Sequence, residues 1–240
     1  MSKKLETNKP KNNWHINSID YAFEKTNSKI LGLSSDQAQQ RLKENGANVL
    51  PQKKPKPFIL MLLKEFSNPI ILILLVAMVF SFIVGELLDG FVILGIILVD
   101  AIIGAIQEKR AQRVASSLSQ MIKVKAKVLR DGQKVEIESK DLVVGDIVFL
   151  ESGDKISADM RIVECSNFTV DEALLTGESI NATKDIFEVK ADAPLGDRTC
   201  MVFSGSSVIT GRAKCVVVET GTNTEIGKIS NNLNTRRILH

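Results

Sequence analysis

Two long apolar runs, separated by a short polar turn, constrain the fold of this chain more than any other feature. The first reads FSNPIILILLVAMVFSFIVG over 66–85, and the second reads FVILGIILVDAIIGAI over 91–106. The first has the roughly 20 apolar residues that a helix needs to cross a bilayer, and the second approaches that length when Leu87 and Leu88 are included. Two adjacent runs this apolar favour a transmembrane helical hairpin over 58–106 rather than a buried hairpin inside a soluble protein.

The charges beside the two runs predict how the hairpin is oriented. Basic side chains flank its outer ends, at Lys53, Lys54, Lys56 and Lys64 before the first run and at Lys109, Arg110 and Arg113 after the second. The turn between the runs carries only Glu86 and Asp89. Because cytoplasmic loops are enriched in Lys and Arg, we expect a multi-pass protein of the cell membrane with both termini in the cytoplasm.

Asp100 stands inside the second run. A carboxylate at that depth is costly, so it is expected to face a partner helix or a water-filled path. Contact with helices from outside these 240 residues and a role in ion binding both remain open.

Composition excludes several classes of function. The net charge of +3 arises from 31 basic and 28 acidic residues, and with one Trp and one Tyr it argues against nucleic-acid binding. Cys165, Cys200 and Cys215 are widely spaced, so we expect isolated thiols rather than a disulfide framework or a metal site. His15 and His240 lie at opposite ends, so no His-based ligand set or Ser-His pair can be proposed.

The segment before the hairpin, 1–57, is polar and has no signal-peptide hydrophobic region. Within it, Ser34 or Ser35 can cap a short helix that Gly46 ends, and Pro51 prevents any continuation. We therefore expect a cytoplasmic N-terminal segment with one capped helix.

The periodicity changes after the hairpin. A polar helical stalk is expected over 107–121, a mostly β domain over 122–222, and a helical tail over 223–240 that starts at Asn223 or Thr224. Asp131-Gly132 between two alternating runs is a strong hairpin signal. Further strands are expected at 146–151, 161–165, 201–209 and 213–220, with turns at Gly145, Gly153, Gly196 and Gly211.

The stretch DEALLTGES, 171–179, places acids on both sides of a Thr-Gly pair. Taken alone, TGES is a weak signal, and a turn capped by Thr176 or Ser179 would explain it. Three earlier acids, Asp146, Asp154 and Asp159, also follow turns or begin strands. A single acid of this kind would be explained as a solvated turn, but their recurrence, with Asp171 and Glu172, before the Gly-Glu turn is harder to dismiss.

Longer stretches around this motif resemble a known family. VVGDIVFLESGDKISADMRIVE (143–164), VDEALLTGES (170–179) and MVFSGSSVITGRAKCVVVETGTNTEIGKI (201–229) closely resemble the actuator domain of P-type cation-transporting ATPases. Residues 14–51 resemble the segment that precedes the first membrane helix in that family. TGTNTEIGKI and this segment are most similar to the bacterial calcium-transporting branch.

The resemblance implies an α+β membrane protein in which a transmembrane α-helical hairpin is joined to a mostly β cytoplasmic actuator domain. In that family an Asp of a separate domain takes the γ-phosphate of ATP, and the TGES loop then promotes its hydrolysis. By this analogy Glu178 positions and polarises the attacking water. Gly177 allows close approach to the phosphate, and Thr176 and Ser179 orient the loop and the water.

The resemblance also implies what else the reaction needs. The sequence contains no DKTGT phosphorylation motif, so sites for ATP and Mg²⁺ are not expected in it, and the chain alone is expected to be inactive. Its expected partners are membrane lipid, the transported cation with Ca²⁺ favoured, and the phosphorylation and nucleotide-binding domains or another pump chain. We expect truncation before a third helix. A non-catalytic membrane-anchored module or half of a split pump is the alternative, and a soluble hydrolase using Glu178 lacks a nucleophile or metal set.

Overall fold

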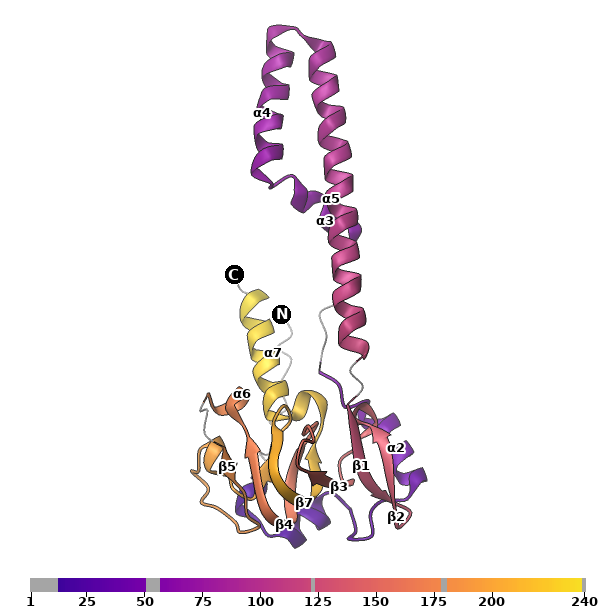
Figure 1. Cartoon of the computed structure of the whole chain (residues 1–240), viewed down its shortest axis with the longest axis vertical. Helices are drawn as coiled ribbons and strands as arrows, with labels where there is room; N and C mark the ends of the chain where they lie inside the picture. The colour runs from indigo at the N-terminus through magenta and orange to yellow at the C-terminus, as the bar shows by residue number, and fades with distance from the viewer. Residues whose placement is uncertain (1–12, 51–56, 122–123, 178–180, 239–240) are drawn as a thin grey trace, which may run out of the picture. The chain divides into compact units, whose positions relative to one another are not determined.

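The computed structural model describes residues 13–50, 57–121, 124–177 and 181–238. The chain divides into two compact units, one formed by 1–51 with 123–240 and the other by 52–122. We call them the sheet unit and the helical unit (Figure 1). The helical unit is inserted in the sequence of the sheet unit, so the sheet unit is built from two separate stretches of chain.

The helical unit begins with a bend. Helix α3 (Phe58–Glu65) and helix α4 (Pro69–Val84) meet at 67°, so the helix predicted over 66–85 starts at Pro69 rather than at Phe66. Pro69 disfavours a helical conformation at the residue before it, and Asn68 is extended, with φ −69° and ψ 130°. The Asn68 Oδ1 then accepts a 3.0 Å hydrogen bond from the Ile70 N–H and caps α4.

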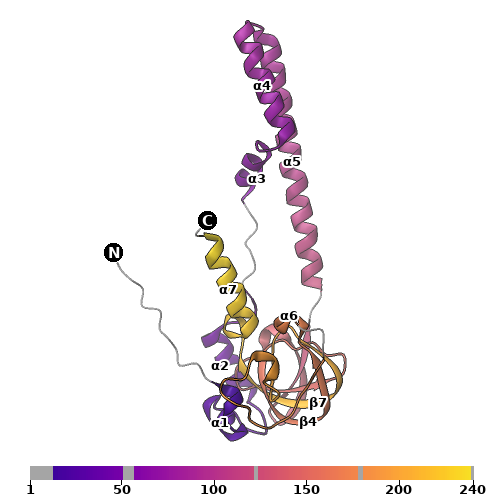
Figure 2. The same ribbon diagram turned by 90° about the vertical axis from the view of Figure 1, so that its left-hand side faces the viewer.

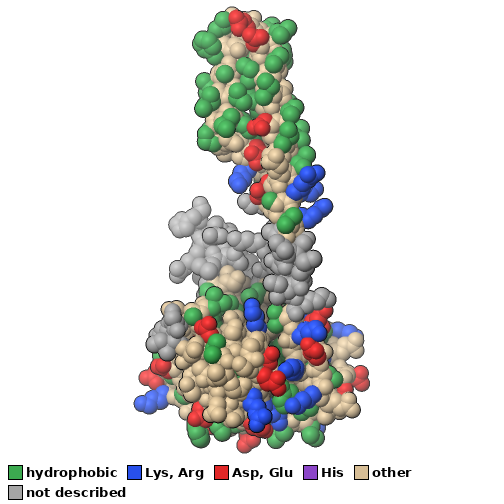
Figure 3. Space-filling view, in the orientation of Figure 1, with side chains coloured by type: hydrophobic (Ala, Val, Ile, Leu, Met, Phe, Trp, Pro, Cys, Tyr) green, Lys and Arg blue, Asp and Glu red, His purple; other side chains and the backbone are tan. Residues whose placement is uncertain are grey.

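Helix α5 (Leu87–Met121) is continuous for 35 residues and includes the predicted stalk. It packs against α4 through the buried side chains Ile71, Ile97 and Ala101. Most other apolar side chains of the unit face outward, and they cover much of the surface seen in Figure 3. Within the described residues, Leu87–Val114 is the one helix long and apolar enough to cross a membrane by itself, and α3 with α4 reaches that length only as a bent pair.

The sheet unit is mostly β, as predicted. Its strands run antiparallel in the order β2-β1-β3-β7-β4-β5, and β6 pairs with β4. They are β1 (Lys125–Arg130), β2 (Gln133–Glu138), β3 (Ile147–Glu151), β4 (Asp159–Asp171), β5 (Ala182–Thr183), β6 (Met201–Val202) and β7 (Ser207–Glu219). The Asp131-Gly132 hairpin is confirmed, because both residues have the positive φ that a two-residue type I′ turn requires, 52° and 72°.

Strand β7 passes through Gly211 without ending, so the predicted turn there is wrong. Gly211 has a φ of +80°, and a Cβ on it would lie 2.2 Å from the Asn167 carbonyl oxygen and 2.4 Å from that of Ser166. The β4–β7 register shifts between Ser166 and Thr169 at the same place. Gly211 therefore lets two long strands approach closely across an irregularity in their pairing.

Side chains of β7 alternate between two apolar clusters. Cys215 and Val217 belong to one cluster, and Val216 and Val218 belong to the other. Successive residues of a strand face opposite sides of a sheet, so the sheet has apolar contacts on both faces. The second cluster includes Trp14 from the N-terminal stretch, whose side chain is only 8% exposed.

The N-terminal stretch packs on the sheet as part of the same unit (Figure 2). It contains helix α1 (Ile19–Lys25) and helix α2 (Ser35–Asn45), and α2 starts with a capping box at Ser34 and ends at Gly46, as predicted. The Asn48 side-chain amide donates to the Ser139 and Ser157 carbonyls and accepts from the Gly221 N–H. The stretch is therefore bonded to residues far along the chain.

The remaining helices follow β4 and β7. Helix α6 (Ala173–Thr176) is one turn long, and helix α7 (Glu225–Ile238) follows β7. Thr224 precedes α7 and its hydroxyl accepts a 3.1 Å hydrogen bond from the Gly227 N–H, which confirms one of the two predicted starts. Short 3₁₀ turns lie at Trp14–Ile16, Ser139–Asp141, Leu195–Asp197 and Gly221–Asn223.

Candidate functional site

The TGES loop leaves β4 through the single helical turn α6. Asp171 Oδ1 accepts a 2.9 Å hydrogen bond from the Ala173 N–H, which starts the turn. The Glu172 carbonyl oxygen then accepts from the N–H groups of Leu175 and Thr176 at 2.9 and 3.0 Å, and from the Thr176 hydroxyl at 3.1 Å. The Glu172 carbonyl oxygen thus accepts three of the hydrogen bonds that hold this turn.

Gly177 ends the turn in the left-handed conformation, with φ 76° and ψ 1°. Its N–H donates to the Ala173 carbonyl at 2.9 Å. It is exposed, and a Cβ on it would meet nothing of the described chain within 4 Å. The backbone conformation is thus one reason for glycine here, because other residues rarely adopt a positive φ.

The structure places two of the four predicted site residues. Thr176 and Gly177 are adjacent at the end of α6, with the Thr176 hydroxyl held on the Glu172 carbonyl rather than free. Glu178 and Ser179 lie outside the described residues. Their predicted roles therefore stay predictions.

A buried ion pair at the base of the loop was not anticipated from the sequence. Lys184 Nζ lies 2.7 Å from Glu172 Oε1, and the two side chains are 0% and 2% exposed. Burial raises the pKa of Glu172 and lowers that of Lys184, while the charge of each partner opposes the shift of the other. The sequence placed Glu172 at a turn but gave no signal that Lys184, twelve residues later, is its partner.

The other acids flagged by the sequence are used inside the fold. Asp146 accepts from the Arg130 guanidinium at 2.7 and 3.0 Å, and Asp154 accepts from the Glu151 N–H at 2.9 Å. Asp159 accepts from two backbone N–H groups, and its burial raises its pKa to about 7. Each of these three carboxylates therefore serves a different local contact within the fold.

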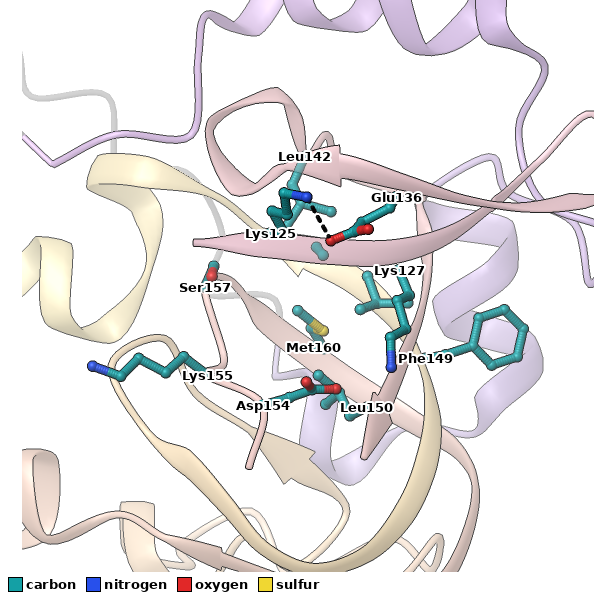
Figure 4. Close-up of a pocket in the computed structure, with 12 residues that line it drawn as sticks. Lys125, Lys127, Glu136, Leu142, Phe149, Leu150, Asp154, Lys155, Ser157 and Met160 are labelled. Atoms are coloured by element: carbon teal, nitrogen blue, oxygen red, sulfur yellow. Dashed lines mark ion pairs between the residues drawn. The ribbon is translucent and has the colours of Figure 1, made fainter. Parts of the chain in front are cut away.

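A small cavity of about 90 Å³ lies elsewhere in the sheet unit, against β1, β3 and the start of β4 (Figure 4). Buried Met160 and Leu142 line it together with charged residues. Lys125 on its rim pairs with Glu136 at 3.2 Å. Thr176 and Gly177 do not line this cavity, so it is separate from the described part of the loop.

The three cysteines are free thiols, as expected. Cys200 and Cys215 are buried, and Cys165 is partly exposed. Within the described ranges, no group of three or more His, Cys, Asp and Glu side chains is arranged to hold a metal ion.

Comparison with known families identifies the domain formed by this antiparallel sheet and its exposed, glycine-ended loop. Residues 120–234 match the family model of the P-type ATPase actuator domain, and residues 14–81 match that of the cation transporter/ATPase N-terminus. The chain belongs to the P-type ATPase family, which confirms the resemblance seen in its motifs.

Relatives in several organisms share this region. The chain is 38% identical over 234 residues to sodium/potassium exporting P-type ATPase 2 of Saccharomyces cerevisiae, covering 96% of this chain and 21% of the relative. It is 38% identical over 204 residues to a calcium-transporting ATPase of Listeria monocytogenes, covering 85% and 23% respectively. A cation-transporting ATPase of Synechocystis is 42% identical over 203 residues, with 85% and 22% covered. The chain thus spans about a fifth of the length of these relatives.

Proposed function

We propose that this chain supplies the actuator part of an ATP-driven cation pump, and that the loop at 176–179 promotes hydrolysis of an aspartyl-phosphate held on a separate domain. The observation that carries this proposal is the exposed glycine at the end of α6, in a domain of the P-type ATPase family. Nothing of the described chain lies within 4 Å of the Cβ position of Gly177, which supports an approach of a second domain to this turn.

The proposed roles follow from the chemistry of each group. Glu178 positions and polarises the attacking water, as a carboxylate within hydrogen-bond reach can. Thr176, whose hydroxyl is bonded to the Glu172 carbonyl, fixes the first residue of the loop, and Ser179 orients its other side. ATP and Mg²⁺ act on the phosphorylation and nucleotide-binding domains, supplied by further chain or by another polypeptide, and no described residue is assigned to either.

Ca²⁺ is the cation we favour. The relatives from Listeria monocytogenes and Lactococcus lactis are named calcium-transporting ATPases, whereas the yeast relatives are named sodium/potassium exporting. ATP-driven uptake of radioactive Ca²⁺ or Na⁺ into vesicles that contain the assembled pump separates the two assignments. Uptake of Na⁺ without Ca²⁺ would reject our choice.

The helical unit is proposed to cross the membrane twice, through α3 with α4 and through α5. The 16 residues of α4 extend about 24 Å, short of a hydrocarbon core of about 30 Å, so α3 contributes to the first crossing. The basic flanks then keep both termini cytoplasmic. In intact cells, Glu86→Cys should react with an impermeant maleimide, while Lys109→Cys should react only after permeabilisation; the reverse pattern would refute this topology.

The catalytic proposal is tested in a chimera that joins this chain to the remainder of the calcium-transporting ATPase of Listeria monocytogenes. Glu178→Gln should still allow phosphorylation by ATP but should slow decay of the phosphoenzyme by about 100-fold or more, because about 100-fold is the lower end of the usual contribution of a general base. Glu24→Gln makes the same chemical change at an exposed position of α1 and should decay normally. Normal decay in Glu178→Gln would show that the role given to this carboxylate is wrong.

A further inference from the structure

The Glu172–Lys184 ion pair is unusual because it is completely enclosed. The side chains are 2% and 0% exposed, and apart from their mutual contact neither has a hydrogen-bond partner among the described residues. The remaining surroundings of Lys184 include the ring of buried Phe203, whose centroid lies 5.8 Å from Nζ. Enclosed ion pairs of this kind stabilise a fold no better than apolar side chains of similar size, so stability alone does not account for it.

The position of the pair supplies another explanation. Glu172 directly precedes α6, and its carbonyl oxygen holds the Thr176 N–H and hydroxyl. Lys184 directly follows β5, and its N–H donates to the Phe168 carbonyl of β4 at 2.9 Å. The ion pair therefore joins the two ends of the segment 173–183, which contains the whole TGES loop.

The contact is also exclusive. Because each charge is enclosed and has only the other as its partner in the described chain, separating them would leave two unpaired buried charges. A backbone hydrogen bond at the surface can be replaced by a hydrogen bond to water. The ion pair cannot be replaced in this way, because both of its side chains are buried. The ion pair therefore restricts the distance between the start of α6 and the end of β5 to a single value. The two ends of the loop are held in one position as a result.

We propose that Glu172 and Lys184 are positioning residues that hold the TGES loop in place for dephosphorylation. This inference rests on the function proposed for the loop. Neither side chain is exposed, so neither touches the phosphate; both act through Thr176 and through the segment they close. The pair fixes the positions of the two ends of the loop. Glu178, the proposed catalytic carboxylate, lies in the sequence between these two fixed ends.

The first test uses the full chain in detergent micelles and needs no activity. Glu172→Met with Lys184→Met removes both charges and keeps apolar bulk, so this variant should fold where Lys184→Met alone leaves a buried unpaired carboxylate. Hydrogen–deuterium exchange is read at the Thr176, Gly177 and Lys184 amides, which are hydrogen-bonded in the native chain. We expect exchange there to rise at least tenfold in the double variant.

A second buried ion pair provides a matched control. Arg130 lies 2.7 Å from fully buried Asp146 and joins β1 to the turn before β3, in a different part of the same sheet. Arg130→Met with Asp146→Met removes both charges of this second pair in the same way. It should lower the thermal midpoint of the unit but leave exchange at Thr176, Gly177 and Lys184 unchanged. Unchanged exchange at these amides in the folded double Met variant would overturn the inference.

The second test reads the reaction itself in the chimera. The double Met variant should form phosphoenzyme at the normal rate and lose it at least tenfold more slowly, whereas a merely structural defect would lower both steps together. Arg130→Met with Asp146→Met should leave the ratio of the two rates unchanged. A normal decay rate in a double variant with increased exchange would also overturn the positioning role.

The two proposals fail in different ways. Normal decay in Glu178→Gln would reject the proposed function, whatever the exchange measurements show. Normal exchange in the charge-free variant would reject the ion pair as a positioning element, whatever Glu178 does.

Discussion

Gly211→Ala is the substitution whose effect on stability follows most directly from the geometry. Gly211 lies inside β7 with a φ of +80°, and an added Cβ would stand 2.2 Å from the Asn167 oxygen and 2.4 Å from the Ser166 oxygen. Both are backbone atoms of β4, so the methyl group cannot be accommodated by turning a side chain. The two strands must move apart where they now pair.

Two costs add at this position. A left-handed conformation costs an L-residue roughly 1–2 kcal/mol. Forcing an extra methyl group into a packed contact costs about 1–3 kcal/mol more. The free energy of unfolding should therefore fall by about 2–5 kcal/mol, and since 1 kcal/mol shifts the midpoint of a domain of this size by roughly 2–4 °C, we expect a loss of about 10 °C.

The chain provides its own reporter and its own control. Trp14 is the single tryptophan, is 8% exposed, and donates to Glu219 at the end of β7, so its fluorescence reports unfolding of the sheet unit. Gly153→Ala provides the control, because Gly153 has a φ of +91° and nothing within 4 Å of its Cβ position. It incurs the conformational cost without the collision.

The informative quantity is the difference between the two variants, measured by thermal or denaturant unfolding in detergent micelles. Gly211→Ala should unfold several degrees below Gly153→Ala. Equal midpoints for both would show that β4 and β7 absorb the methyl group freely, and the close approach would then not be the reason for glycine at 211.

Three other predictions follow from buried or capping groups. Asp159 has a pKa raised from 3.8 to about 7 by burial, so its contribution to stability is full below about pH 4 and is lost as the pH rises through 7; Asp159→Asn should flatten the dependence of the thermal midpoint on pH across this window. Ser34→Ala removes the hydroxyl of a capping box and should lower the free energy of unfolding by about 1 kcal/mol, measured by denaturant titration. Partly exposed Cys165 should be alkylated by iodoacetamide before buried Cys200 and Cys215, as judged by peptide mass spectrometry, and equal rates would contradict the burial described.

Local sequence signals predicted the local structure well. Asp131-Gly132 specified its hairpin, and Ser34 and Gly46 specified the two ends of a helix, because each signal acts within a few residues of itself. The bend before Pro69 was also encoded locally, by an asparagine that caps and a proline that begins α4, but it was missed because 66–85 was interpreted as one apolar run.

Features that depend on strand register were not predictable in the same way. Gly211 resembles a turn residue in the sequence, and only its pairing with the irregular part of β4 shows why it lies within a strand. Lys184 contacts Glu172 because β5 pairs with the end of β4, at Thr169 and Val170. No periodicity in the sequence of 173–184 predicts the contact between Lys184 and Glu172.

The insertion of the helical unit into the sheet unit determines the order in which the sheet unit can be completed during synthesis. Asn48 bonds to Gly221, which is added 173 residues later, or about 10–35 s at typical rates of translation. Until Gly221 is added, the N-terminal stretch has been synthesised but the part of the sheet unit on which it packs is incomplete. The helices of the helical unit are synthesised during this interval. Strand β7, which lies between β3 and β4 and carries part of the contact with Trp14, is the last of the described strands to be made. The sheet is therefore completed at its centre, in one late step that joins the N-terminal stretch to β7 and Gly221.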